Sequence, residues 1–222
     1  MTKQYQDKQE AIEALNSGAR FHTKQFDSFR DDPDVTLEAI ENKFLEIIRI
    51  SPALQTEEFI CRVMDYSGEG FQLLKPEMKA NKKVALAAVT NWGHTLGACD
   101  EQLRDDRQVV YAAVKNTGSA LNAASSRLKQ DPEIFHLALE THGWALEHGT
   151  ESDKANEQTV LKAIKLHPKA IKHASQEIQG IVGDSENPAE TLEKFINARD
   201  LHSKISNKIA TKHDRPTRGI KI

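Results

Sequence analysis

The feature that most constrains the fold of this chain is a repeat of about 25 residues. The segment DRQVVYAAVKNTGSALNAASSRLKQ, which begins at Asp106, is followed 25 residues later by a second copy that begins at Asp131. Extending this spacing in both directions gives seven starts: Asp7, Asp32, Thr56, Asn81, Asp106, Asp131 and Asn156. Aspartate, asparagine and threonine are favoured before helices, because their side-chain oxygen accepts a hydrogen bond from a backbone N–H that the helix leaves free. Each repeat is therefore predicted to begin with a helix.

Further positions recur after each start. A small residue at the seventh position precedes a large apolar one, as in Ala88–Val89. At the twelfth position lie Gly68, Gly93, Gly118, Gly143 and Pro168. Glycine there is expected to adopt the left-handed conformation that ends a helix, and proline also stops one. Each repeat is thus predicted to contain a helix of about ten residues, a tight turn and a second helix of similar length.

These repeats predict an all-α fold. No stretch alternates with the period of two that is typical of strands, and helices of this length are not stable alone in water. We expect residues 7–180 to form an α-solenoid of about seven 25-residue helix-turn-helix repeats, because stacking buries their apolar faces. Residues 181–213 are expected to add a C-terminal capping helix to the same domain, interrupted near Arg199. Residues 214–222 are expected to be a basic, flexible tail.

The repeat resembles a short helical repeat of bacteria and protists known as domain of unknown function 4116. The resemblance is plainest in DDRQVVYAAVKNTGSALNAASSRL (Asp105 to Leu128) and in NKKVALAAVTNWGHTLGAC (Asn81 to Cys99). It fades in the first two repeats and does not reach past Gly180. The resemblance implies a helical repeat and a bacterial setting that includes effector-like proteins, but it transfers no chemistry and no functional residue.

Composition narrows the class of protein. The 222 residues carry a net charge of −3, so no global excess of positive charge argues for nucleic acid. The longest uninterrupted apolar stretch, Val84 to Val89, is too short to span a bilayer, and the charged N-terminus lacks the apolar core of a signal peptide. We therefore expect a cytoplasmic protein, or one that is delivered into a host cell without a classical signal peptide.

The chain carries no recognisable motif for catalysis or for a cofactor. It has no phosphate-binding glycine loop, no H-E-x-x-H and no closely spaced cysteines. His142 and His167 occupy equivalent positions in adjacent repeats, which lie about 10 Å apart when helices pack, so a shared zinc ion is not expected. Cys61 and Cys99 fall at positions that are apolar in the other repeats, and we expect them to be buried, reduced thiols. We predict no metal, no cofactor and no catalytic residue.

The turns between the helices form the candidate site. Both tryptophans lie in them, with histidines at neighbouring or equivalent positions. Tryptophan is enriched in protein interfaces, because it removes a large area from water and keeps one polar group. The candidate protein-binding residues are Tyr66, Trp92, His94, His142, Trp144 and His167. The alternative is that each indole folds back over the apolar face of the neighbouring repeat.

Three functions remain open. The first is a non-enzymatic scaffold that binds another protein, as a bacterial effector or as an inhibitor or regulator. The second is binding of nucleic acid or anionic lipid through the basic tail, since residues 200–222 carry six lysines or arginines and two aspartates, a net +4, whereas the other 199 residues carry 24 basic and 31 acidic side chains, a net −7. The third is an enzyme, which we do not expect, and which loss of activity in His142→Ala or Cys99→Ala would reveal.

Overall fold

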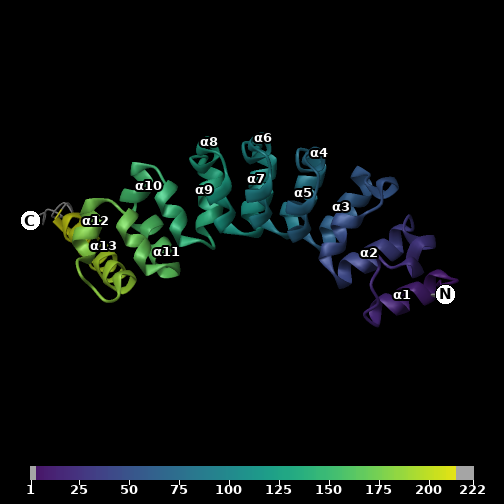
Figure 1. Cartoon of the computed structure of the whole chain (residues 1–222). Helices are drawn as coiled ribbons and strands as arrows, with labels where there is room; N and C mark the ends of the chain where they lie inside the picture. The colour runs from purple at the N-terminus through teal and green to yellow at the C-terminus, as the bar shows by residue number, and fades with distance from the viewer. Residues whose placement is uncertain (1–3, 214–222) are drawn as a thin grey trace, which may run out of the picture. The chain divides into compact units, whose positions relative to one another are not determined.

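The computed structural model describes residues 4–213, and these contain helices and no strand (Figure 1). The predicted all-α class is confirmed. The chain divides into two compact units, unit 1 up to Thr141 and unit 2 from His142. The expected boundaries of a single domain over 7–180, and the count of seven stacked repeats, stay predictions.

Unit 1 alternates α-helices with 3-10 helices. Its longer α-helices are α1 (Lys8–Asn16), α2 (Pro33–Asn42), α3 (Glu57–Tyr66), α5 (Lys82–Asn91), α7 (Arg107–Asn116) and α9 (Pro132–Leu139). Its short α-helices are α4 (Pro76–Lys79), α6 (Glu101–Arg104) and α8 (Ser126–Lys129). Its 3-10 helices are η1 (Lys24–Phe29), η2 (Phe44–Arg49), η3 (Pro52–Leu54), η4 (Gly68–Leu73), η5 (Gly93–Ala98) and η6 (Gly118–Ala123).

Unit 2 continues the same alternation and ends in one long helix. Its elements are η7 (Gly143–His148), α10 (Glu151–Ala155), α11 (Glu157–Leu166), η8 (Pro168–His173), α12 (Gln176–Val182) and α13 (Pro188–His213). In this unit α11 packs against η7, η8 and α13.

The predicted helix starts are confirmed. Each of the seven start residues is the N-cap of a helix, with a side-chain oxygen that accepts a hydrogen bond from a backbone N–H in the first turn. At α7, for example, Oδ1 of Asp106 accepts from the N–H groups of Gln108 and Val109 at 3.0 and 3.2 Å. A cap of this kind stabilises a helix by about 1 kcal/mol, so the repeating sequence fixes where each first helix begins.

The prediction of a second ten-residue helix in each repeat is wrong. From the third repeat onward, a 3-10 helix of six residues takes its place, followed by a short α-helix, whereas in the second repeat η2 is followed by the 3-10 helix η3. The break falls at a residue in extended conformation, after which Asp100 or Ser125 caps the short helix with its side chain. These capping residues compete with the backbone hydrogen bonds of a continuous helix and therefore divide the segment in two.

The role predicted for the turn glycines is also wrong. Among residues 4–213, only Gly18 and Gly183 have a positive φ. Gly93 is required for a different reason, since a Cβ atom there would lie 2.3 Å from the carbonyl oxygen of Ala113. In unit 2, a Cβ on Gly143 would lie 2.2 Å from the carbonyl oxygen of Ala163. Glycine thus lets the start of each of these 3-10 helices touch the first helix of the next repeat.

Neighbouring repeats of unit 1 stack through their first helices. Figure 1 shows α3, α5 and α7 in succession, and α5 packs against both of the others. Val84, Ala85, Ala88 and Val89 of α5 are fully buried, and a buried valine contributes about 1.5–3 kcal/mol relative to an exposed one. Burial of these small and branched side chains is the main favourable contribution to the stacking.

Ion pairs join the starts of adjacent first helices in unit 1. Lys82 Nζ lies 2.7 Å from Oδ2 of Asp106, and Arg107 Nε lies 3.0 Å from Oδ2 of Asp131. Lys8 and Lys83 make equivalent pairs with acidic residues of the next or the preceding repeat. A capping carboxylate such as that of Asp106 therefore accepts hydrogen bonds from its own helix and also pairs with a cation of the neighbouring repeat. Such exposed pairs contribute little individually, and here they favour one register of stacking.

The C-terminal helix differs from the prediction in one respect. Helix α13 runs without interruption through Arg199, because residues 189–213 contain no glycine or proline and the Arg199 guanidinium is held by the carboxylate of Glu157. Leu192 and Ile196 are its buried contacts. No helix in the described part of the chain is both long and apolar enough to span a membrane. The expected basic tail, residues 214–222, lies outside the described residues.

We predict that Gly93→Ala lowers the free energy of unfolding by about 2 kcal/mol or more, because the new Cβ has to displace backbone rather than a flexible side chain. Gly97→Ala, four residues later in η5, is the matched control, since its Cβ would meet Ala123 at an ordinary 3.9 Å. It should change stability by at most about 1 kcal/mol, in the stabilising direction. Urea unfolding followed by circular dichroism compares the two. Equal stabilities would show that the close approach is unimportant.

Candidate protein-binding edges

The 3-10 helices form one edge of each unit, and the six candidate residues divide between these edges. Tyr66, Trp92 and His94 belong to the edge of unit 1, which we define as η4, η5 and η6 with the two residues before each. Tyr66, the last residue of α3, is 56% exposed. His94 is exposed and Trp92 is half-buried. The structure brings Trp92 and His94 together, with ring centroids 6.1 Å apart, and shows no ring contact to Tyr66.

Trp92 has a packing role. Its side chain covers Gly68 so closely that a Cβ atom on that glycine would lie 2.2 Å from the indole Cδ1. The indole thus folds back over the preceding repeat, as the alternative reading of the sequence expected. Its half-buried ring also lies edge-on to the exposed imidazole of His94.

A groove of about 560 Å³ lies between η4 and η5. Its floor is backbone and small side chains, and its rim carries three polar side chains. The lining residues are Gly68, Glu69, Gln72, His94, Thr95, Gly97 and Ala98. Buried Thr95 donates a hydrogen bond from Oγ1 to the carbonyl oxygen of Gly68 at 3.4 Å, which ties the two sides of the floor together.

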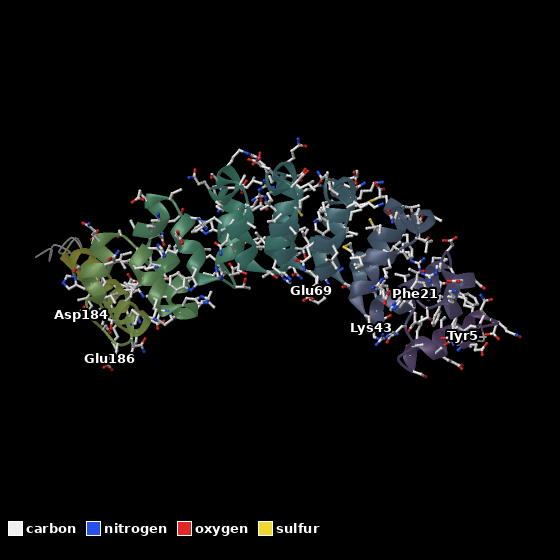
Figure 2. The ribbon with its side chains drawn as sticks, in the orientation of Figure 1. Tyr5, Phe21, Lys43, Glu69, Asp184 and Glu186 are labelled. Carbon is white, nitrogen blue, oxygen red and sulfur yellow. The ribbon has the colours of Figure 1, made fainter. Side chains whose placement is uncertain are left out.

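Glu69 lines the groove but was not among the candidate residues, although its position in the repeat could have indicated it. Glu69 holds the same repeat position as His94, thirteen residues after the start, and Figure 2 shows it at the border of the ribbon of unit 1. Gln72 and Gly97 are likewise equivalent to each other. The groove is lined by glycine and alanine in η5 and by longer polar side chains in η4. This difference in side-chain size between neighbouring 3-10 helices is not evident when equivalent repeat positions are compared one at a time.

In unit 2 the candidate residues form one cluster around Trp144. The rings of His142 and His167 lie 5.5 Å apart, and the Trp144 ring lies 6.2 Å from His167 and 5.8 Å from His173. Lys172 Nζ lies 4.9 Å from the centroid of the indole. The two equivalent histidines are closer than the helix spacing of about 10 Å suggested, because their side chains lean toward each other.

His167 makes a hydrogen bond that joins two neighbouring repeats of unit 2. Its Nδ1 accepts a hydrogen bond from the N–H of Gly143 at 3.1 Å. In unit 1, Oδ1 of Asn116 accepts the corresponding bond from the N–H of Gly93 at 2.8 Å. In both units, the start of a 3-10 helix is thus held by a polar side chain of the next repeat.

Two other histidines of this cluster are kept neutral by burial. Burial lowers the pKa of His142, and the neighbouring His167 lowers it further. Burial also lowers the pKa of His173, against the opposing effect of Glu147. The Nε2 atoms of both rings are buried without a hydrogen-bond partner. A proton on His173 would add a positive charge close to Lys172, and a proton on His142 would add one close to His167.

The remaining candidates for chemistry are poorly placed for it. Cys99 is buried, and burial raises the pKa of its thiol to about 12. Cys61 is half-buried, and burial with the nearby carboxylates of Glu57 and Asp65 raises its pKa as well. Both environments disfavour the thiolate, which is the nucleophilic form. Over residues 4–213, no three histidine, cysteine or acidic side chains converge as metal ligands.

This architecture defines the class: an all-α protein with a helical-repeat-like chain. Residues 81–179 match the model of a family described as a domain of unknown function (DUF4116), in three overlapping segments, 81–129, 106–148 and 131–179. The segments begin 25 residues apart, which is the period seen in the sequence, and the resemblance to this family is confirmed. No curated protein and no solved structure shows significant similarity to the chain.

We predict that acid destabilises unit 2. The folded pKa of His142 and His173 lies below the ordinary value of 6.5, so the unfolded chain binds protons at a higher pH than the folded unit. Their contribution to stability is present above that value and is lost as the pH falls through it. Urea midpoints from Trp144 fluorescence, in a Trp92→Phe background, should therefore decrease from about pH 7.5 to about pH 5.5.

The variant His142→Gln/His173→Gln should flatten this dependence. His94→Gln, a change at an exposed position of unit 1, is the matched control and should leave it intact. A pH profile that is equally steep in all three proteins would contradict a role for the two buried imidazoles.

We also predict that the two cysteines react slowly with a thiol reagent in the folded protein. A shift from the ordinary 9.0 to about 12 reduces the thiolate fraction of Cys99 at neutral pH about a thousandfold. In the Cys61→Ala variant, native Cys99 should react at least about a hundredfold more slowly than in guanidinium. In Cys99→Ala, partly exposed Cys61 should react faster than that. Rapid labelling of native Cys99 would show that it is accessible.

Proposed function

We propose that this protein is a non-enzymatic scaffold that binds another protein through the edges formed by its 3-10 helices. The observation that carries the proposal is the groove between η4 and η5, which is lined by the exposed side chains of Glu69, Gln72 and His94. A groove of about 560 Å³ can accept several side chains of a partner.

The construction of the edge supports this proposal. On the η5 side the groove is lined by exposed Gly97 and half-buried Ala98, so backbone lies close to the surface there and a partner can approach it. Trp92 packs against the floor residue Gly68 and fixes the adjacent His94, so the rim is partly ordered before a partner arrives. Pre-ordered polar groups beside an aromatic anchor are typical of interfaces, because less side-chain freedom is lost on binding.

The biological role and the cellular compartment are also part of the proposal. A bacterial effector, or an inhibitor or regulator of another bacterial protein, needs an exposed recognition surface rather than a catalytic centre. We place the protein in the cytoplasm, or in a host cell after delivery. Binding of nucleic acid or anionic lipid by residues 214–222 stays a prediction, since that segment lies outside the described residues.

The decisive variant is Glu69→Ala/Gln72→Ala, because both side chains are exposed and neither supports the core. Immobilised full-length protein is used to capture partners from bacterial and host-cell lysates, and the affinity of the enriched partner is then measured with purified components. The groove variant should bind it at least about tenfold more weakly, which corresponds to 1.4 kcal/mol.

Glu101→Ala/Gln102→Ala is the matched control, with the same two residue types exposed on α6, away from the groove. It should bind like the unmodified protein. Trp92→Ala is a poorer probe, because it also removes the packing over Gly68. A partner that binds the groove variant and the control equally well would place recognition elsewhere and defeat this proposal.

A further inference from the structure

We propose that the edge of unit 2 binds an acidic segment of a partner protein. The inference rests on the proposed scaffold function and adds the chemistry of the partner. The surface, called here the basic edge, consists of Trp144, His167, Lys169, Lys172 and His173, all on η7 and η8 or next to them.

Charge pairing sets this surface apart from α10, from the C-terminal turn of α11 and from the first turns of α13. Lys154, Lys165 and Lys194 each lie within 3.8 Å of a carboxylate oxygen. Lys169 is exposed and has no carboxylate partner among the described residues, and Lys172 is directed onto the Trp144 ring. Two cations on one short helix are therefore left without neutralising carboxylates, and an acidic partner would supply them.

One acidic side chain, Glu147, lies beside the basic edge. Its Oε2 atom lies 3.9 Å from Nε2 of His173, on the side of the cluster where burial keeps that imidazole neutral. Glu147 therefore offsets part of the positive charge, but no ion pair joins it to either lysine of η8 among the described residues. Lys169 and Lys172 outnumber this one carboxylate, although the whole chain carries a net charge of −3.

Trp144 gives this charged surface an ordered aromatic anchor. Its ring is held between His167 and His173, and Lys172 lies 4.9 Å from its centroid. Beside the same edge, Leu166 is 42% exposed. A cation fixed over an indole, next to an exposed leucine, suits a segment that combines carboxylates with an apolar side chain.

The distribution of charge favours a protein segment over a nucleic acid. In the three repeats that begin at Thr56, Asn81 and Asp106, the residues equivalent to Lys169 are Glu69, His94 and Ser119, and those equivalent to Lys172 are Gln72, Gly97 and Asn122. A phosphate backbone requires cations in successive repeats, and neither position holds a lysine or an arginine in these three repeats. A short acidic peptide needs only the two lysines and the indole.

The test uses a fluorescein-labelled, glutamate-rich peptide that contains two leucines, with glutamine-rich and lysine-rich versions as controls. Fluorescence anisotropy with the full-length protein should show binding of the glutamate peptide alone. Lys169→Glu/Lys172→Glu should weaken this binding at least about tenfold. The peptide should also change the fluorescence of Trp144 in a Trp92→Phe background, which locates the contact.

Lys75→Glu/Lys115→Glu is the matched control, because it reverses two exposed lysines of unit 1 and gives the same net charge. Unchanged helicity by circular dichroism confirms that each variant folds, and Lys169→Gln/Lys172→Gln is the milder substitute if the reversal does not. Equal loss of binding in the control, or no change in Trp144 fluorescence, would overturn the inference. So would a single-stranded oligonucleotide that binds more tightly than the peptide through the same lysines.

The outcome is separable from that of the proposed function. A natural partner that is lost with Glu69→Ala/Gln72→Ala but still bound by Lys169→Glu/Lys172→Glu would leave the scaffold function standing and refute the basic edge. A glutamate peptide that binds through Lys169 and Lys172, with no dependence of any partner on the groove, would support the basic edge and refute the groove.

Discussion

The close contact between the start of a 3-10 helix and the next repeat is the constraint on which the rest of each unit depends. At Gly93 and Gly143 the backbone approaches a carbonyl oxygen of the following first helix so closely that no side chain fits. The same glycine N–H groups donate to Asn116 and His167. A backbone donor that has left the α-helical ladder is thereby satisfied, and the separation of successive repeats is fixed by a polar bond as well as by apolar packing.

Much of the fold was predictable, because the signals were local. A capping side chain needs only its own first turn, so Asp106 and the other starts could be located from sequence. The second half of each repeat was not, because a 3-10 helix and an α-helix bury apolar residues at similar spacings. Asp100 and Ser125 cap the short helices after the break. From sequence alone, however, each could equally have been a polar residue inside a continuous helix. The glycines were recognised at the correct positions, but the close neighbour that requires them is another repeat.

For the candidate site, the sequence predicted which residues lie on the edges but not which side chains touch. Repeat columns located His94 and Trp144 on the edges, and the same columns contained Glu69. Columns do not give the distance between side chains, however, so the contacts of Trp144 with His173 and Lys172 could not be derived. They depend on side-chain directions at η7 and η8. The buried state of the imidazoles has the same origin, since it arises from packing between residues that are distant in sequence.

The overlapping family matches have a consequence for how such chains can change in length. Each matched segment spans one repeat and most of the next, and the contact at Gly93 likewise joins one repeat to its successor. The smallest piece that contains a complete junction is then a pair of neighbours. Duplication or loss of one 25-residue copy would recreate the same junction on both sides of the change. Meanwhile, exposed positions such as those of Glu69, His94 and Lys169 contribute little to that junction and are free to diversify, so that a lineage could alter its recognition surface one copy at a time without redesigning the core.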